Sequence, residues 1–448
     1  MKEEFYVHNL FRESKELFLR QDPHLRRAAL QPFTYTSPMV DTPEFLKPGI
    51  LMITGGRQVG KTTCLKQLIA KLMSEGQVLP DQVSFMTGEL IRDDAELRWE
   101  ITSELEGKNE WHLLIIDEIS YVKDWDKAVK FLADAGLLDQ TTLILSGSDS
   151  SIIREAMKRF AGRRGRSEKV DFVFHPLGFA ETVMLKAPEM SGLVAACQQT
   201  ECSIDPPGYA ECIPQFETLF DEYLVHGGYL TAIADTLRGG KIEAATFRTY
   251  AEWLRGDVLK HNKQEKYLFE VLRGMMRTYA SQVSWVSLAK QLSIEHHKTV
   301  SDYVSILEDM NAVIVQEAFA EHSFSAAPKK AKKLYFEDPF IFHAVEMMLG
   351  KTNEESAPAL AETIAVAHFY RKYGKTYYIK GKKGEVDVVY VQDKTFFPVE
   401  IKWTKQVRSE ELKQIMGYNN GLILGRNHRS SQIAHIPYVS LIRYLLGI

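Results

Sequence analysis

The chain has 448 residues, 45% of them hydrophobic and 25% charged, which is typical of a globular protein. No apolar run approaches the roughly 18 residues that cross a bilayer, and the first residues lack the basic and apolar regions of a secretory signal. We therefore expect a cytoplasmic protein with no membrane contact. The four cysteines, Cys64, Cys197, Cys202 and Cys212, are too few for a disulfide framework and are predicted to be free thiols.

Charge is distributed unevenly along the chain. The formal net charge is −4, but residues 371–448 contain 14 Lys and Arg against 6 Asp and Glu, a balance of +8. The first 370 residues therefore carry −12. Such asymmetry makes the C-terminal segment the expected contact for a polyanion such as DNA.

After a polar start, the N-terminal part of the chain alternates between strand-like and helix-like hydrophobic patterns. Residues 1–45 are polar and mixed and are predicted to be an N-terminal extension. An apolar strand is expected over 49–54, followed by helices over 61–75, 94–104 and 124–135 and strands over 83–86, 113–116, 142–145 and 170–174. Strands that alternate with helices predict an α/β fold with a parallel sheet covered by helices, over residues 46–186.

Beyond Pro176 this alternation stops. Residues 187–213 contain several prolines and glycines and are predicted to be irregular, so 187–262 is interpreted as a linker and helical lid. Residues 263–345, with two or three helices before an apolar run, fit a winged-helix module. Two of its helices are expected over 286–292 and 298–310. The second is acidic, which favours packing or a subunit contact over major-groove reading. A helix over 357–373 opens the last domain, 355–448.

One segment matches the phosphate-binding pattern G-x-x-x-x-G-K-[ST]. Its glycines allow backbone N–H groups to surround phosphate oxygens, the helix that follows directs its positive end at them, and lysine and hydroxyl side chains reach the phosphates and Mg²⁺. The predicted nucleotide-binding residues are Gly55, Gly56, Arg57, Gln58, Val59, Gly60, Lys61, Thr62 and Thr63. The expected ligands are ATP and Mg²⁺.

Acidic and hydroxyl side chains end two later strands. Asp117 follows four apolar strand residues and is predicted to hold Mg²⁺ together with Thr62, whereas Glu118 is predicted to activate the attacking water. Ser146 and Ser148 end the strand that follows along the chain, and either is a candidate for sensing the γ-phosphate.

The run from Arg154 to Lys169 holds seven basic and two acidic residues. A solvated face is one interpretation. The other is that Arg163 or Arg164, in a turn between two glycines, faces a triphosphate in a neighbouring subunit and neutralises transition-state charge. This second interpretation predicts a homo-oligomer.

These motifs resemble the bacterial and archaeal AAA-type ATPases, through GGRQVGKTT, LLIIDEISYVKDW, LSGSDSS and the GRRG turn followed by HPLGFAE. The segments QDPHLRR and YLVHGGY are also similar to this family. The resemblance implies a P-loop ATPase core, a helical lid, a winged helix and a C-terminal nuclease-like domain.

The basic tail contains two strand candidates around a polar turn. If Asp393 and Lys394 form a two-residue hairpin turn, paired residue numbers sum to 787, so Asp387 lies opposite Glu400 and Lys402 shares their face. The opposite face is apolar, and a helix predicted over 411–418 suggests that both faces are covered. Buried carboxylates there would need a metal or the lysine.

The pattern D…E-x-K after a helix resembles the PD-(D/E)XK nuclease superfamily. That resemblance implies that Glu362, Asp387 and Glu400 bind Mg²⁺ and that Lys402 activates water for phosphodiester cleavage. The alternative is that these polar residues form the solvent-exposed face of an ordinary hairpin.

The expected function is therefore a Mg²⁺-dependent ATPase of the AAA type fused to a nuclease-like domain and acting on or near DNA. The alternative is an ATP-gated signalling or interaction switch whose tail binds nucleic acid or protein without cutting it. A small-molecule kinase is disfavoured, because lid and winged-helix segments follow the core where a kinase needs an acceptor pocket.

Overall fold

The computed structural model describes residues 2–148, 153, 158–160, 162–165, 167–292, 294–350, 356–428, 431–433 and 435–447. The chain forms two compact units, Met1–His175 and Pro176–Ile448. In the described ranges no helix has the length and apolar character needed to cross a membrane. All four cysteines are free thiols, as predicted.

The first unit is built on a five-stranded parallel sheet. The strands lie in the order β2-β3-β4-β1-β5, with bounds β1 Gly49–Thr54, β2 Val83–Thr87, β3 His112–Asp117, β4 Thr141–Gly147 and β5 Asp171–Val173. The helices are α1 Lys15–Gln21, α2 Pro23–Ala29, α3 Lys61–Ser74, α4 Asp94–Leu105 and α5 Trp125–Asp134. Every helix and strand predicted between residues 49 and 174 is present, with bounds within two residues of the prediction.

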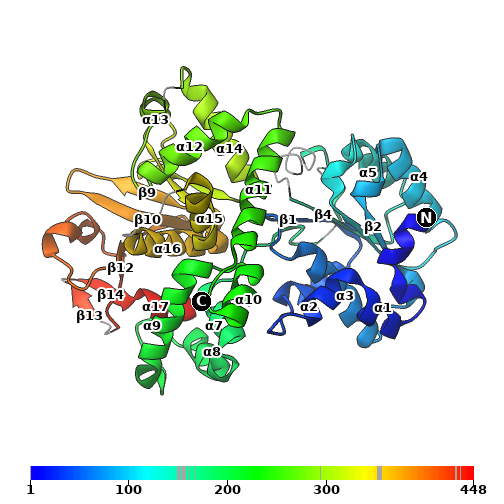
Figure 1. Ribbon diagram of the computed structural model, residues 1–448, viewed down its shortest axis with the longest axis horizontal. Helices are drawn as coiled ribbons and strands as arrows, with labels where there is room; N and C mark the ends of the chain where they lie inside the picture. The colour runs from blue at the N-terminus through cyan, green and yellow to red at the C-terminus, as the bar shows by residue number, and fades with distance from the viewer. Residues whose placement is uncertain are drawn as a thin grey trace. The chain divides into compact units, whose positions relative to one another are not determined.

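Helices cover both faces of this sheet. Helices α4 and α5 lie on one face, while α1, α2 and α3 lie on the other (Figure 1). The α4/α5 face encloses a core that includes Met86, Leu114 and Ile116 of the strands and Leu97 and Ala128 of the helices. Because both faces of the sheet are buried, its strands are continuously apolar instead of alternating with polar residues.

The N-terminal extension packs on this core. The Asn9 side-chain amide donates to the carbonyl of Phe85 over 2.8 Å, and its oxygen accepts from the Phe85 N–H over 2.8 Å. Lys66 of α3 lies 3.3 Å from Asp22, with both side chains fully buried. Residues 1–45 are therefore part of the first unit.

The second unit contains a nine-stranded mixed sheet. Its main path is β13-β14-β12-β11-β10-β9-β6-β7, and β8 pairs with β6. The bounds are β6 Val313–Ala320, β7 Ser325–Ala326, β8 Lys332–Phe336, β9 Tyr377–Lys380, β10 Glu385–Gln392, β11 Thr395–Lys402, β12 Leu422–Gly425, β13 Ser431–Ile433 and β14 Ile436–Ser440. The parallel pairing of β6 with β9 joins the segments 263–345 and 355–448 through one sheet.

Helices surround the second sheet, and α16 lies against β10 and β11 (Figure 1). Their bounds are α7 Phe179–Lys186, α8 Ser191–Gln199, α9 Tyr209–His226, α10 Leu230–Gly239, α11 Ala244–Lys260, α12 Glu265–Arg277, α13 Trp285–Gln291, α14 His297–Asp309, α15 Pro339–Leu349, α16 Ala357–Tyr373 and α17 Leu441–Leu446. The helix predicted over 357–373 and the two predicted over 286–292 and 298–310 are confirmed.

Two sequence predictions in this unit are wrong. Residues 187–213 are not irregular throughout, because Pro188 opens a short 3₁₀ turn where its fixed φ is acceptable and α8 follows with Val194 and Cys197 buried. The predicted helix 411–418 is replaced by two 3₁₀ turns, Ser409–Leu412 and Ile415–Gly417. Leu412 and Ile415 are both fully buried, and a spacing of three suits a 3₁₀ geometry.

The predicted hairpin register is confirmed. Strands β10 and β11 pair antiparallel from Val388 with Val399 to Gln392 with Thr395, and each pair sums to 787. Asp393 and Lys394 form the turn, both with positive φ, at 48° and 61°. Positive φ at both central residues matches the right-handed twist of the two strands.

Candidate nucleotide-binding site and carboxylate cluster

The phosphate-binding segment forms a loop between β1 and α3. Gly60 has φ of 109° and immediately precedes the first residue of α3. At Gly55, a Cβ atom would lie 2.2 Å from the carbonyl oxygen of Phe174, so only glycine fits. The buried ammonium of Lys61 donates to the carbonyls of Gly55 and Gly56, over 2.9 and 2.8 Å. The lysine is thereby held over the loop that its sequence motif assigns to phosphates.

The strand β3 carboxylate contacts the P-loop helix directly. The Thr62 hydroxyl donates to Oδ2 of Asp117 over 2.6 Å. The Ser146 hydroxyl donates to the other oxygen, Oδ1, of the same carboxylate. Asp117 is therefore held on both sides by hydroxyl groups, one from the helix after β1 and one from β4.

The neighbouring carboxylate, Glu118, lies in a different setting. Its backbone has φ of 52°, a left-handed conformation that is uncommon for a residue other than glycine. Burial raises the pKa of Glu118, and the positive charge of Lys61 acts against that increase. The Ser148 hydroxyl lies 3.5 Å from Oε2 of Glu118, at the limit of a hydrogen bond. A carboxylate with a raised pKa is better suited to accept a proton.

The sheet order explains why these groups meet. Strand β4 lies between β1 and β3, and all three strands are parallel. The loop Gly55–Gly60, Asp117 and Ser146 therefore occur at the same carboxyl edge of the sheet, which is where open α/β folds bind ligands.

The donor set at this edge fits Mg²⁺. Mg²⁺ in phosphate-binding sites takes one or two protein oxygens together with substrate phosphates and waters. The Thr62 hydroxyl and the Asp117 carboxylate supply such oxygens, and Asp117 is only 5% exposed. These two residues would hold the ion.

The two candidate arginines lie at the other edge of the sheet. The Ile50 N–H donates to the carbonyl of Arg164 over 3.4 Å, and β1 needs five residues to run from Ile50 to the loop at Gly55, about 16 Å. The Arg164 guanidinium bonds both oxygens of Asp171 over 2.6 and 2.8 Å, whereas Arg163 pairs with Asp134. Arg164 therefore supports the fold of its own chain. Residues 154–157, 161 and 166 of the basic run lie outside the described residues.

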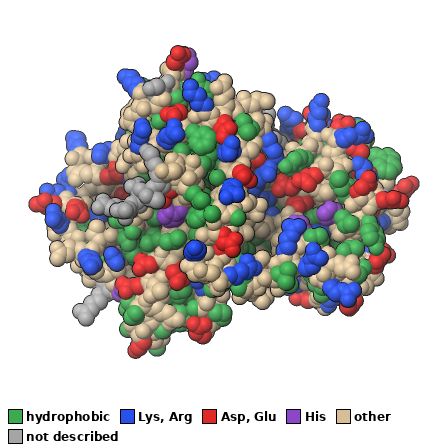
Figure 2. Space-filling view, viewed as in Figure 1, with side chains coloured by type: hydrophobic (Ala, Val, Ile, Leu, Met, Phe, Trp, Pro, Cys, Tyr) green, Lys and Arg blue, Asp and Glu red, His purple; other side chains and the backbone are tan. Residues whose placement is uncertain are grey.

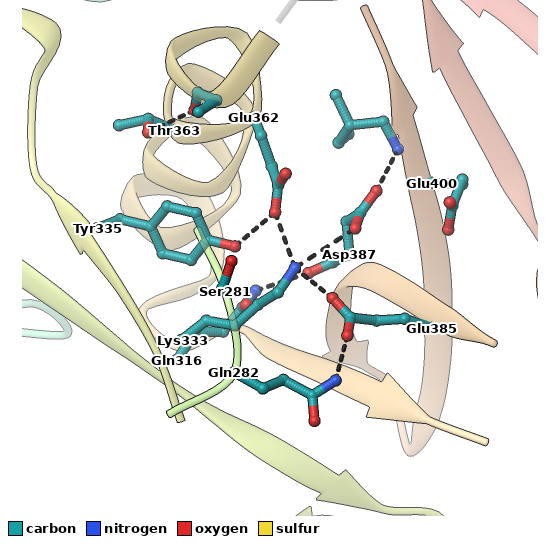
Figure 3. Close-up of polar contacts among 12 residues, drawn as sticks. Ser281, Gln282, Gln316, Lys333, Tyr335, Glu362, Thr363, Glu385, Asp387 and Glu400 are labelled. Atoms are coloured by element: carbon teal, nitrogen blue, oxygen red, sulfur yellow. Dashed lines mark hydrogen bonds and ion pairs between the residues drawn. The ribbon is translucent and has the colours of Figure 1, made fainter. Parts of the chain in front are cut away.

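A second set of carboxylates lies in the other unit, on α16, β10 and β11. Glu400 is 3% exposed, and its Oε1 atom lies 2.7 Å from the Lys402 ammonium. Asp387 accepts the N–H of Ile401 at Oδ2, over 2.9 Å. Glu362 projects from α16 toward Asp387 (Figure 3), and burial, followed by the charge of Asp387, raises the pKa of Glu362.

The residue at the centre of this set is Lys333, which sequence reasoning missed. Its ammonium lies 2.8 Å from Glu362 and 3.4 Å from Asp387 and forms an ion pair with Glu385 (Figure 3). Lys333 was hidden in the run KKAKK, which resembles a solvated charge cluster. The sequence signal that could have identified Lys333 is that Tyr335, two residues later, lies on the same face of the strand.

The residues present do not fit the Mg²⁺ site that the nuclease resemblance implies. Four of the oxygens that would bind the ion, one of Glu362, both of Asp387 and one of Glu400, are bonded to Lys333, Lys402 or the Ile401 N–H. Oε2 of Glu400 is buried and has no hydrogen-bond partner among the described residues. Among the residues that the structure describes, no three His, Cys, Asp or Glu side chains are grouped to hold a metal ion.

Comparison with known proteins assigns the first of these sites to a class. Residues 47–183 match the model of a family described as an AAA domain. This part of the chain is similar to AAA-type ATPases. Residues 217–355 match a domain of unknown function, DUF8612, and residues 358–436 match another, DUF4143.

Solved structures give weaker likenesses. The Walker-type ATPase of Pyrococcus abyssi is 12% identical with a TM-score of 0.42, over 66% of this chain and 91% of that one. The Aeropyrum pernix Orc1 protein in complex with DNA is 12% identical with a TM-score of 0.29, over 76% and 92%. The RuvB Holliday junction branch migration motor of Thermotoga maritima is 15% identical with a TM-score of 0.25, over 59% and 81%. At these scores none of the three supports a functional assignment. A search of curated proteins found no significant match.

Proposed function

We propose that the first unit binds Mg·ATP at Gly55–Thr63 and hydrolyses it. The observation that carries this proposal is the convergence of Lys61, Thr62, Asp117 and Glu118 at one edge of the sheet, with Asp117 bonded to Thr62 over 2.6 Å. The AAA-domain match over residues 47–183 supports the same activity.

Each group has a separate task in this reaction. Lys61 and the loop N–H groups hold the β- and γ-phosphates, and Thr62 and Asp117 hold Mg²⁺, which when bound offsets phosphate charge. Glu118 orients the attacking water and accepts its proton, a task suited to the raised pKa that burial causes. Ser146 keeps the Asp117 carboxylate in place through its hydrogen bond to Oδ1.

The direct test is phosphate release by the full chain with ATP and Mg²⁺. We expect turnover by the wild type and none by Lys61→Ala, and we expect EDTA to abolish it. Folded wild-type protein that never releases phosphate from Mg·ATP would contradict the proposal.

We further propose that the active form is an oligomer in which Arg163 of one subunit faces the triphosphate of the next. Two observations support this. The turn that carries Arg163 is attached to the edge of the sheet opposite its own phosphate-binding loop. Arg164 is held by Asp171 and by the carbonyls of Ile50 and Val170, whereas Arg163 pairs with the exposed Asp134. Turnover per subunit should then rise with protein concentration, because the arginine acts in trans.

For the second unit we propose nucleic-acid binding by the basic segment 371–448. Lys405, Arg408 and Arg426 line a groove of about 950 Å³, and the Arg426 guanidinium lies 5.5 Å from the centre of the Trp403 ring. One acidic residue, Glu217, also lines this groove and contacts His428. Basic and acidic side chains are intermixed over the visible face of this unit, so that face as a whole is a poor contact for nucleic acid (Figure 2). The groove groups basic side chains locally and is therefore the better candidate for the contact.

We infer that residues 263–345 form a winged-helix module in which α13 and α14 follow each other and the β6/β8 hairpin is the wing. A packing role suits it better than DNA reading. Asp302 of α14 pairs with Lys263 over 3.4 Å, and β6 is built into the large sheet.

A further inference from the structure

Lys333 is a lysine buried among acids. It lies on β8, and its side chain is 3% exposed. Its ammonium contacts one carboxylate from α16, Glu362, and two from β10, Glu385 and Asp387. Figure 3 shows these three side chains directed at the ammonium, one from the helix and two from the strand.

The adjacent lysine on the same strand has a different role. Lys332 points to the opposite face, because side chains alternate along a strand. Its ammonium donates to the carbonyls of Pro328 and Lys330, over 2.7 and 3.1 Å. Lys332 therefore provides a matched control for Lys333.

Other protein donors also bond these three carboxylates. The Tyr335 hydroxyl donates to Oε1 of Glu362 over 2.6 Å, and the Ile401 N–H donates to Oδ2 of Asp387 over 2.9 Å. The side-chain amide of Gln282 donates to Oε2 of Glu385. A divalent ion would have to displace several of these donors, because it needs oxygens at about 2.0–2.6 Å.

The charge balance favours retention of the lysine as a cation. Three carboxylates facing one ammonium leave the cluster attractive to cations, and removal of the ammonium would increase that attraction.

We propose that Lys333 is the resident cation of this cluster, occupying the position that a divalent metal would need. The cluster then joins β8 to α16 and β10 and does not cleave phosphodiester bonds with a metal. This inference concerns the second unit alone, so it stands or falls independently of ATP hydrolysis by the first.

The test is titration of the nucleotide-free full chain with Mn²⁺, followed by electron paramagnetic resonance of the free ion. The variants are Lys333→Met, Lys332→Met, Asp387→Asn and the double variant Lys333→Met/Asp387→Asn. Phosphate release from Mg·ATP is measured on the same samples and should not differ among them, which separates this proposal from the ATPase proposal.

We expect neither the wild type nor Lys332→Met to bind Mn²⁺ at the carboxylate cluster. Any Mn²⁺ that the wild type binds elsewhere should also be bound by Asp387→Asn. Lys333→Met should gain Mn²⁺ binding at the cluster, at least about tenfold tighter than the weakest affinity that the titration can detect, the scale on which groups beside metal ligands change affinity. The double variant should lose that gain. A folded Lys333→Met that gains no Mn²⁺ affinity would overturn the proposal.

A second measurement keeps the proposal testable if Lys333→Met does not fold. The wild type is incubated with supercoiled plasmid and Mg²⁺ or Mn²⁺, with and without ATP, beside Asp387→Asn. We expect the same absence of nicking from both. Wild-type nicking that Asp387→Asn abolishes, or Mn²⁺ binding by the wild type that depends on Asp387, shows that the cluster takes a metal and rejects the proposal.

Discussion

The hydroxyl of Thr62 and the carboxylate of Asp117, 55 residues apart in sequence, lie 2.6 Å apart at the edge of the parallel sheet. This contact joins the phosphate-binding loop to the acidic strand end. Each motif alone is short, but their meeting produces the paired oxygen donors that Mg·ATP requires.

Replacement of Glu118 by glutamine should separate nucleotide binding from turnover. The amide cannot accept a proton, so we expect Glu118→Gln to bind ATP as the wild type does and to lose about 10²–10⁴-fold in turnover. Lys61→Ala should lose binding itself. Equilibrium binding of a fluorescent ATP analogue and steady-state phosphate release provide the two readouts. Unchanged turnover by Glu118→Gln would assign the water to another residue.

The two candidate serines should differ. Ser146 donates to Asp117, whereas the Ser148 hydroxyl is 3.5 Å from Glu118. We expect Ser146→Ala to lower turnover by about 10–100-fold, as loss of a group that orients a metal ligand does, and to raise the Mg²⁺ concentration needed for half-maximal rate. Ser148→Ala should have a smaller effect. The reverse order of the two effects would identify Ser148 as the sensor.

The two arginines of the glycine-flanked turn should have distinct phenotypes. Arg163→Ala should lower turnover by about 10³-fold or more if it acts across a subunit interface, with little change in thermal stability. Arg164→Ala should lower the melting temperature, because it removes the bonds to Asp171 and to the Val170 carbonyl. Mixing Arg163→Ala with Lys61→Ala subunits is the control: trans action predicts partial recovery of turnover.

Nucleic-acid binding should depend on the groove. Replacement of Lys405, Arg408 and Arg426 by glutamine removes three positive charges, and we expect weaker DNA binding and a log–log salt slope smaller by about 3. The matched variant replaces the exposed residues Lys380, Lys382 and Lys383, with the same change in charge. Fluorescence anisotropy with a labelled duplex at several salt concentrations measures both. Equal losses from the two variants would mean that net charge matters and the groove does not.

Acid should destabilise the second unit through His226. Its ring accepts from Lys186 at Nε2 over 3.1 Å and contacts the Gly227 carbonyl at Nδ1 over 2.7 Å, so the ring is neutral. Burial, followed by the charge of Lys186, lowers the pKa of His226 to about 4, whereas an unfolded histidine has a pKa of about 6.5. Lys186 also pairs with Glu222.

The loss of stability in acid follows from this difference between the folded and unfolded pKa of His226. As pH falls below about 6.5, the unfolded chain binds the proton first, so stability present above that pH is lost by about 1.4 kcal/mol per pH unit until about pH 4. Hydrogen-exchange protection of the α9 amides between pH 7 and 5 measures this loss. His226→Asn should remove one proton from the uptake on unfolding and so reduce the slope of stability against pH. Replacement of the exposed His322 by asparagine should leave that slope unchanged. An identical slope in both variants would exclude His226 as the group responsible.

The sequence by itself determined the first unit and the local structure of the tail. The P-loop, the acidic strand end and the hairpin register all depend on short-range chemistry: a glycine pattern, apolar periodicity and a two-residue turn. These signals lie within a few residues of one another, so spacing alone is sufficient to recognise them. The prediction of a helix over 411–418 was wrong because buried residues three apart suit a 3₁₀ turn as well as an α-helix.

Only the tertiary structure decided which cation faces the carboxylates. Lys333 and Asp387 are 54 residues apart, on strands with no shared local pattern, and they meet because β8 and β10 are incorporated into the same sheet. The sequence allowed either a metal or a lysine there and pointed to Lys402. The fold paired Lys402 with Glu400 and brought in Lys333, because buried carboxylates must be offset by whichever cation the packing places within reach.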